Sequence, residues 1–79
     1  MNMENIERFE DRSLLIVDDD EPFRTRLERA MENRGFDVVT AASVRDGVAA
    51  ARSKPPAFAV LDLRLADGSG LDIVSAIQE

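Results

Sequence analysis

Two short apolar runs that each end in aspartate constrain the fold of this chain more than any other feature. Residues 14–17 are followed directly by the acidic residues 18–20, and residues 57–61 are followed by Asp62. Continuous β-favouring runs are typical of strands that are buried on both faces of a parallel sheet. The sequence therefore predicts two buried strands with carboxylates at their carboxyl ends.

A helical pattern follows the first strand. Asp20 can cap a helix over about residues 21–34, Pro22 is tolerated in its first turn, and Gly35 ends the pattern. The apolar residues of this helix that we expect in the core are Phe23, Leu27 and Met31.

The rest of the chain repeats the alternation of strand and helix. Residues 36–40 are a second strand, and Ser43 with Asp46 resembles a capping box for a helix that ends near residue 53. After the strand at residues 57–61, Ser69 can cap a last helix. This alternation predicts an α/β fold with parallel strands, right-handed crossovers and helices on both faces of the sheet.

Three of the acidic residues are expected to meet at one edge of this sheet. In open parallel sheets, ligands bind beyond the carboxyl ends of the strands, where successive connections diverge. If the strands lie in the order 2-1-3, then Asp18, Asp19 and Asp62 share that crevice.

A cluster of three carboxylates predicts a metal ion, because such groups repel one another unless a cation lies among them. The chain has no histidine and no cysteine, so its ligands are hard oxygens, which favour Mg²⁺ or Mn²⁺. One neutralised carboxylate can then attack a phosphoryl donor in line and form an aspartyl phosphate. The pattern favours a phosphoacceptor over a general hydrolase.

The same residues resemble a known family. The strings LLIVDDDE, VLDLRL and DGSGL, and the spacing from Asp19 to Asp62, are similar to the receiver domains of two-component response regulators. Residues 11–23 and 62–72 resemble, within that family, the RegA/PrrA/ActR group of redox-responsive transcriptional regulators.

This resemblance implies a role for each site residue. Asp62 would be the phosphorylation site, Asp18 and Asp19 would be the acidic metal-binding pair, and the main-chain carbonyl of Arg64 would be a further metal ligand beside Asp62. It also implies a phosphoacceptor domain rather than an enzyme, with a sensor histidine kinase as phosphate donor. Ala66 stands where many receivers have proline, which would alter the rigidity of that loop.

The resemblance further implies a partial domain. Receivers have five strand and helix pairs, so we expect residues 13–79 to form a truncated flavodoxin-like, doubly wound sheet of three strands and three helices, after a loosely ordered leader at 1–12. The later switch Ser or Thr and the Lys are missing, and Lys54 would lie at the opposite end of the sheet from Asp62. We expect weak phosphate acceptance, and a homodimer through the open edge of the third strand or by exchange of elements.

Charge and hydropathy limit the partners. The net charge of -6 argues against direct nucleic-acid binding, so DNA would be reached only through a missing output domain. The apolar runs are far shorter than the roughly 20 residues of a membrane span, so we expect a cytoplasmic location. Arg24, Glu28 and Glu32 are expected on the outer side of the first helix, for solubility or as a kinase contact.

Several alternatives stay open. Acidic runs are usually solvated surfaces, and Asp67 fits a turn with Gly68 better than a metal site. An aspartyl-nucleophile phosphatase would also place acids at the spacing of Asp18 and Asp20, but Pro22 stands where Thr or Val is expected. A pseudo-receiver would serve only as a protein-interaction module, and the intact acidic cluster counts against it.

Overall fold

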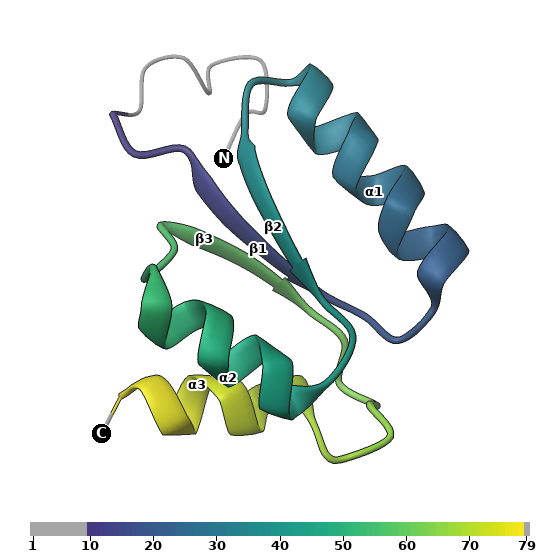
Figure 1. Cartoon of the computed structure of the whole chain (residues 1–79), viewed down its shortest axis with the longest axis vertical. Helices are drawn as coiled ribbons and strands as arrows, with labels where there is room; N and C mark the ends of the chain where they lie inside the picture. Colours follow the sequence, from purple (N-terminus) through teal and green to yellow (C-terminus); the bar gives the residue numbers. More distant parts are fainter. Residues whose placement is uncertain (1–9, 79) are drawn as a thin grey trace.

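The chain folds into alternating strands and helices (Figure 1), and the computed structural model describes residues 10–78. The elements in chain order are β1 (Ser13–Val17), α1 (Glu21–Asn33), β2 (Asp37–Ala41), α2 (Val44–Ser53), β3 (Phe58–Leu61) and α3 (Gly70–Ile77). The predicted α/β fold, with parallel strands in the order 2-1-3, is confirmed. None of the described helices is long and apolar enough to cross a membrane. Residues 1–9 of the predicted leader lie outside the described residues, and the division at residue 12 stays a prediction.

β1 is the central strand, and its whole length is buried. It pairs in parallel with β2 on one side and β3 on the other, so that Leu14 lies opposite Val38 and Phe58. α1 covers one face of the sheet, and α2 and α3 lie together on the other face (Figure 1). A strand that is covered on both faces needs apolar side chains on both, which explains the continuous apolar run.

Each face of the sheet has its own apolar cluster. The buried residues on the side of α2 and α3, which include one residue from each helix, are Leu15, Val17, Ala41, Ala51, Leu65 and Ile73. Those under α1 are Leu14, Ile16 and Phe36. Phe36 also meets Phe58 of β3 edge to face, with 5.6 Å between the ring centroids. Alternate residues of β1 therefore hold the two layers of helices to one sheet.

The prediction that Phe23 belongs to the core is wrong, because its side chain is 43% exposed. Leu27 and Met31, one and two turns further along α1, do pack against the cluster on that face. α1 begins after a loop that leads away from the ends of the strands (Figure 1), so its first turn lies beyond the apolar surface that the later turns cover. The helical spacing of the three apolar residues was predicted correctly, but the sheet is too short to cover all three of them.

The helix caps agree closely with the sequence. Ser43 accepts a hydrogen bond from the Asp46 N–H at 3.1 Å, which is one half of the predicted capping box of α2. A complete capping box occurs at α3, where Ser69 caps the helix as predicted and the Asp72 carboxylate accepts from the Ser69 N–H at 2.9 Å. These caps fix where each helix starts relative to the strand before it.

Ser13 ties the start of β3 to the start of β1. Its buried hydroxyl accepts from the Ala57 N–H at 2.9 Å and donates to Asp11 Oδ1 at 2.6 Å. Hydrogen bonds from Ser13 lower the pKa of the Asp11 carboxyl. The two strands thus start in register, and they also end in register at the opposite edge.

Gly70 lets α3 approach the end of β3 closely. Its N–H donates to the Asp62 carbonyl at 2.9 Å, and a Cβ on Gly70 would lie 2.5 Å from that carbonyl oxygen and 2.7 Å from Leu61 Cβ. Both distances are well inside van der Waals contact, and the carbonyl belongs to the backbone, which cannot rotate away.

Gly70→Ala is therefore expected to lower the free energy of unfolding by about 1–3 kcal/mol, the usual cost of overpacking. Urea titrations followed by circular dichroism measure it, with Ser75→Ala at an exposed position of the same helix as control. A Gly70→Ala variant as stable as wild type would show that α3 can shift away from the end of β3 without cost.

Candidate metal centre

The carboxyl ends of β1 and β3 place two aspartates side by side. The Asp62 N–H donates to the Val17 carbonyl at 2.9 Å, and the Asp18 N–H donates to the Ala41 carbonyl of β2 at 3.1 Å. Strand pairing thus continues for one residue beyond each strand and fixes the backbone of both aspartates. Their side chains leave the sheet at the same edge.

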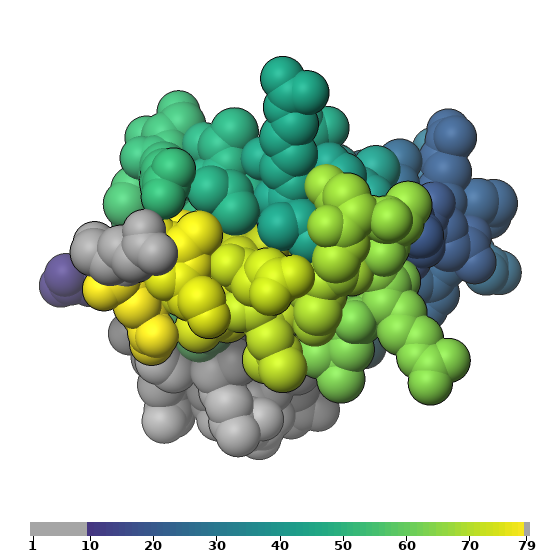
Figure 2. All heavy atoms as spheres, turned by 90° about the horizontal axis from the view of Figure 1, so that it is seen from below, coloured from purple at the N-terminus to yellow at the C-terminus, as the bar shows by residue number. Residues whose placement is uncertain are grey.

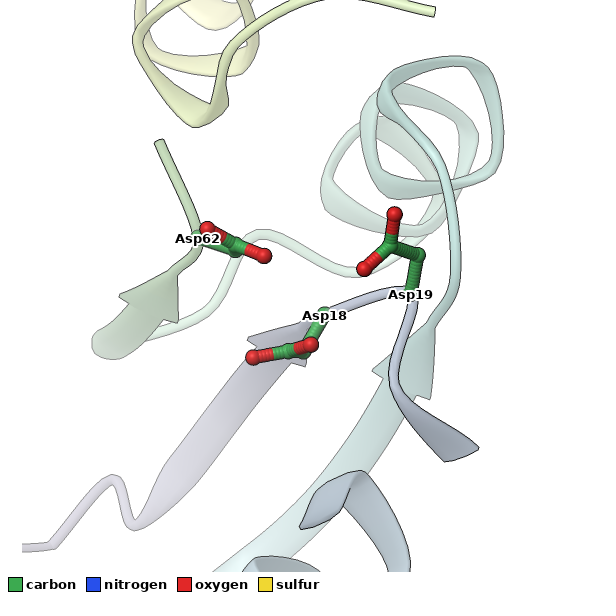
Figure 3. A group of neighbouring side chains, drawn as sticks. All are labelled: Asp18, Asp19 and Asp62. Atoms are coloured by element: carbon green, nitrogen blue, oxygen red, sulfur yellow. The ribbon is translucent and has the colours of Figure 1, made fainter. Parts of the chain in front are cut away.

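Asp18, Asp19 and Asp62 point toward one another in this crevice (Figure 3). One carboxylate oxygen from each lies within 4.8 Å of the other two, with Asp18 and Asp62 half-buried and Asp19 exposed. Two Mg–O bonds of about 2.1 Å placed opposite each other span about 4.2 Å. Small side-chain rotations would therefore bring all three oxygens to one ion.

Short local hydrogen bonds orient two of these carboxylates. Asp18 Oδ1 accepts from the Asp20 N–H at 2.9 Å, and Asp62 Oδ1 accepts from the Arg64 N–H at 3.0 Å. In each case the donor lies two residues further along the chain, so the side chain is held by the turn that follows its strand. Each carboxylate keeps its second oxygen for a ligand.

Asp20 has the capping role that the sequence predicts. Its Oδ1 accepts from the Phe23 N–H at 3.1 Å at the start of α1. Of the three consecutive aspartates, the first two therefore face the crevice and the third starts the helix.

Arg24 contributes to the site in a way that the sequence did not reveal. We expected it on the outer side of the first helix, but it is half-buried and its Nη1 donates to the Asp18 carbonyl at 2.8 Å. Arg24 lies in the first turn of α1, and its long side chain reaches from there to the backbone just after β1. One signal in the sequence could have indicated this contact. Arg24 follows the helix cap Asp20 by one turn, and the cap itself lies close to the end of a strand.

The loop from β3 to α3 contains Arg64, whose side chain is exposed. Leu65 and Gly68 pair across a tight turn, with N–H to carbonyl distances of 2.8 and 3.2 Å. Asp67 lies in that turn with Gly68, as the sequence predicts. The metal-binding role of the Arg64 carbonyl stays a prediction.

Asp67 also bonds to a distant helix, which the sequence did not indicate. Its Oδ1 accepts from the Val44 N–H at 2.8 Å and its Oδ2 from the Arg45 N–H at 3.1 Å. These two hydrogen bonds lower the pKa of the Asp67 carboxyl. Lys54, by contrast, follows α2 at the amino end of β3, so it is remote from Asp62 as predicted.

Comparisons with known proteins show what this chain is similar to. The family described as "Response regulator receiver domain" matches residues 14–79. The photosynthetic apparatus regulatory protein RegA of Cereibacter sphaeroides is 62% identical over 69 residues, which are 87% of this chain and 38% of RegA. The acid tolerance regulatory protein ActR of Rhizobium meliloti is 62% identical over 68 residues, which are 86% of this chain and 35% of ActR. This chain therefore spans well under half the length of either relative.

A solved structure supports the fold. The crystal structure of a signal receiver domain from Vibrio parahaemolyticus aligns with a TM-score of 0.78 over 86% of this chain and 52% of that chain. At 24% sequence identity this likeness concerns the architecture alone.

The clustered charges predict a stability that depends on divalent ions. Asp19→Asn should leave the chain at least as stable as wild type in a chelator, because it relieves repulsion. In millimolar Mg²⁺ the order should reverse, since an ion at about 100 times its Kd stabilises the fold by about 2.7 kcal/mol. Thermal melts with and without Mg²⁺ measure both effects.

Asp37→Asn is the matched control, because Asp37 is an exposed carboxylate at the other end of the sheet. If Mg²⁺ raised the melting temperature of wild type and Asp19→Asn equally, the three acids would not form a metal centre.

Proposed function

This chain belongs to the family of response regulator receiver domains, and on that premise we propose that Asp62 accepts a phosphoryl group from a sensor histidine kinase. One Mg²⁺ or Mn²⁺ would be held by Asp18, Asp19, Asp62 and the main-chain carbonyl of Arg64. The observation that carries the proposal is the convergence of three carboxylates, each with an oxygen within 4.8 Å of the others.

The chemistry needs a carboxylate that is fixed but not fully engaged. Asp62 Oδ1 is held by the Arg64 N–H and would bind the ion with its remaining lone pair, so the second oxygen would be left to attack the phosphorus atom in line. An O–P bond to Asp62 forms as the N–P bond to the kinase histidine breaks, and the donor leaves with the bonding electrons. The bound cation would neutralise charge on the transferring phosphoryl group.

The position of the acidic pair, Asp18 and Asp19, depends on contacts of the Asp18 backbone. The Asp18 N–H donates to the Ala41 carbonyl, and the Asp18 carbonyl accepts from the Arg24 side chain. These contacts keep the acidic pair at the end of β1 although the acids repel one another. A fixed arrangement of this kind lowers the cost of assembling the site around an ion.

The wider role follows from the relatives. RegA and ActR are named as regulators of the photosynthetic apparatus and of acid tolerance. We propose that this chain likewise serves as a cytoplasmic phosphoacceptor in a transcriptional regulator, and not as an enzyme. With a net charge of -6, the chain would leave DNA contacts to an output domain.

Phosphorylation can be tested directly. Incubation with acetyl phosphate and Mg²⁺ should give an acyl phosphate, in the low yield that weak acceptance implies, that mass spectrometry maps to Asp62 and that hydroxylamine removes. Asp62→Asn should abolish it, and Asp19→Asn should reduce the yield about tenfold or more, because losing even a hydrogen-bond partner of a metal ligand costs about that much in metal affinity or activity. Asp37→Asn should behave as wild type.

Two other results would contradict the proposal. Steady release of phosphate without a trapped acyl phosphate would favour the phosphatase alternative. An unmodified Asp62, with no binding of beryllofluoride in its place, would favour a pseudo-receiver.

We also propose that the isolated chain forms a homodimer through the outer edge of β3. In the described sheet β3 is an edge strand, and Val60 on it is 43% exposed. The outer side of an edge strand can pair with a second chain, and an exposed apolar side chain on that strand favours such pairing.

Light scattering at micromolar concentration should therefore give a dimer mass for wild type. Val60→Lys should shift the population toward monomer, because a charge on an edge strand opposes edge-to-edge pairing. Ser75→Lys on the exposed side of α3 controls for added charge. A monomeric wild type would refute this proposal and leave the one on Asp62 untouched.

A further inference from the structure

The loop between β3 and α3 is closed at its base. Asp62 accepts through its carbonyl from the Gly70 N–H at 2.9 Å, so the first and last residues of the loop are held together. Leu65 points into the core and is 9% exposed. Strand pairing fixes the Asp62 backbone and the core holds Leu65, so the part of this compact loop that still needs an anchor is its far end.

Asp67 holds that far end to α2. Both of its carboxylate oxygens accept hydrogen bonds from the first two residues of the helix, Val44 and Arg45, at 2.8 and 3.1 Å. Figure 2 shows the loop lying directly against the start of α2. The partners precede Asp67 by 23 and 22 residues, so this is a cross-link between separate elements.

α2 does not depend on Asp67 for its N-cap. Ser43 caps the helix through the Asp46 N–H, and Asp67 satisfies the two N–H groups that Ser43 does not reach. Each hydrogen bond from a helix N-terminus to a carboxylate is charge-assisted. The contact thus adds to the cap that Ser43 already provides, and it also fixes the loop relative to the helix.

α2 is a firm anchor for this purpose. Gly47 lets the helix pack so closely that a Cβ there would lie 2.7 Å from Ile73 Cδ1 and 3.2 Å from Val17 Cγ2. Ala51, one turn further on, is 3% exposed. The same helix therefore contacts β1, which ends in the acidic pair, and the loop, which begins at the proposed acceptor.

We propose that Asp67 is a positioning residue of the metal centre. Its carboxylate ties the loop to α2, and the loop in turn orients the Asp62 side chain through the Arg64 N–H and holds the Arg64 carbonyl where one ion shared with Asp18 and Asp19 requires it. The inference deepens the proposed function and rests on it. Asp67 acts through Asp62 and Arg64 and does not itself contact the ion.

Metal affinity separates this role from a purely structural one. In Mn²⁺ titrations of the full chain, followed by electron paramagnetic resonance of free Mn²⁺, Asp67→Ala should weaken binding about tenfold, the lower end for partners of metal ligands. Asp67→Asn keeps one acceptor oxygen and should weaken it less. Circular dichroism checks that each variant is folded.

Two matched controls act on the same helix end. Ser43→Ala removes the other cap of α2 without touching the loop, and should change Mn²⁺ affinity less than twofold although it lowers the melting temperature. Asp46→Asn removes one exposed charge from the first turn of α2 and measures the long-range electrostatic effect. The loss in Asp67→Ala should exceed that of both controls.

Equal losses of affinity in Asp67→Ala and in either control, or no loss in Asp67→Ala, would overturn the inference. If Asp67→Ala does not fold, an Asp67→Asn variant with the affinity of Asp46→Asn overturns it as well. Asp62→Asn tests the underlying proposal separately, because it should weaken Mn²⁺ binding whatever Asp67 does. If it does not, the metal centre itself is wrong and the role of Asp67 falls with it.

Discussion

Burial of β1 on both faces is the constraint on which the rest of the structure depends. Ile16 and Val17 are completely buried, and their side chains point to opposite layers of helices. Because the strand is fixed along its whole length, the residue after it has a defined place at the edge of the sheet. The acids of the site are therefore positioned by apolar side chains that never touch a ligand.

Repulsion among the acids of the site lowers the stability that the core provides. Three carboxylates converge where the sheet ends, and nearby backbone N–H groups bond to only some of their oxygens. The arrangement makes sense for a chain that binds a cation there, since the repulsion becomes attraction once an ion is present. The cost is local, because β1 is anchored independently of the acids beyond it.

Sequence patterns predicted the features that depend on neighbouring residues. Buried strands produce continuous apolar runs, so the strands and the positions of Asp18 and Asp62 at their ends could be inferred from these runs, whereas the strand order 2-1-3 followed from the resemblance to receiver domains. Phe23, Arg24 and Asp67 were misjudged or incompletely described, because their surroundings are set by elements that lie beside them only after folding. For Phe23 the length of the sheet determines the exposure. For Arg24 and Asp67 the surroundings are determined by hydrogen bonds to other elements.

The central position of β1 also has a consequence for how the chain is made. β1 emerges from the ribosome before either of its neighbours, and β3, which completes its pairing, ends only at Leu61. Until then the most apolar segment of the chain can pair with β2 alone, and its other side stays uncovered. Parallel pairing through crossovers is slow compared with helix formation, so nascent chains expose this segment to aggregation and to chaperones during synthesis.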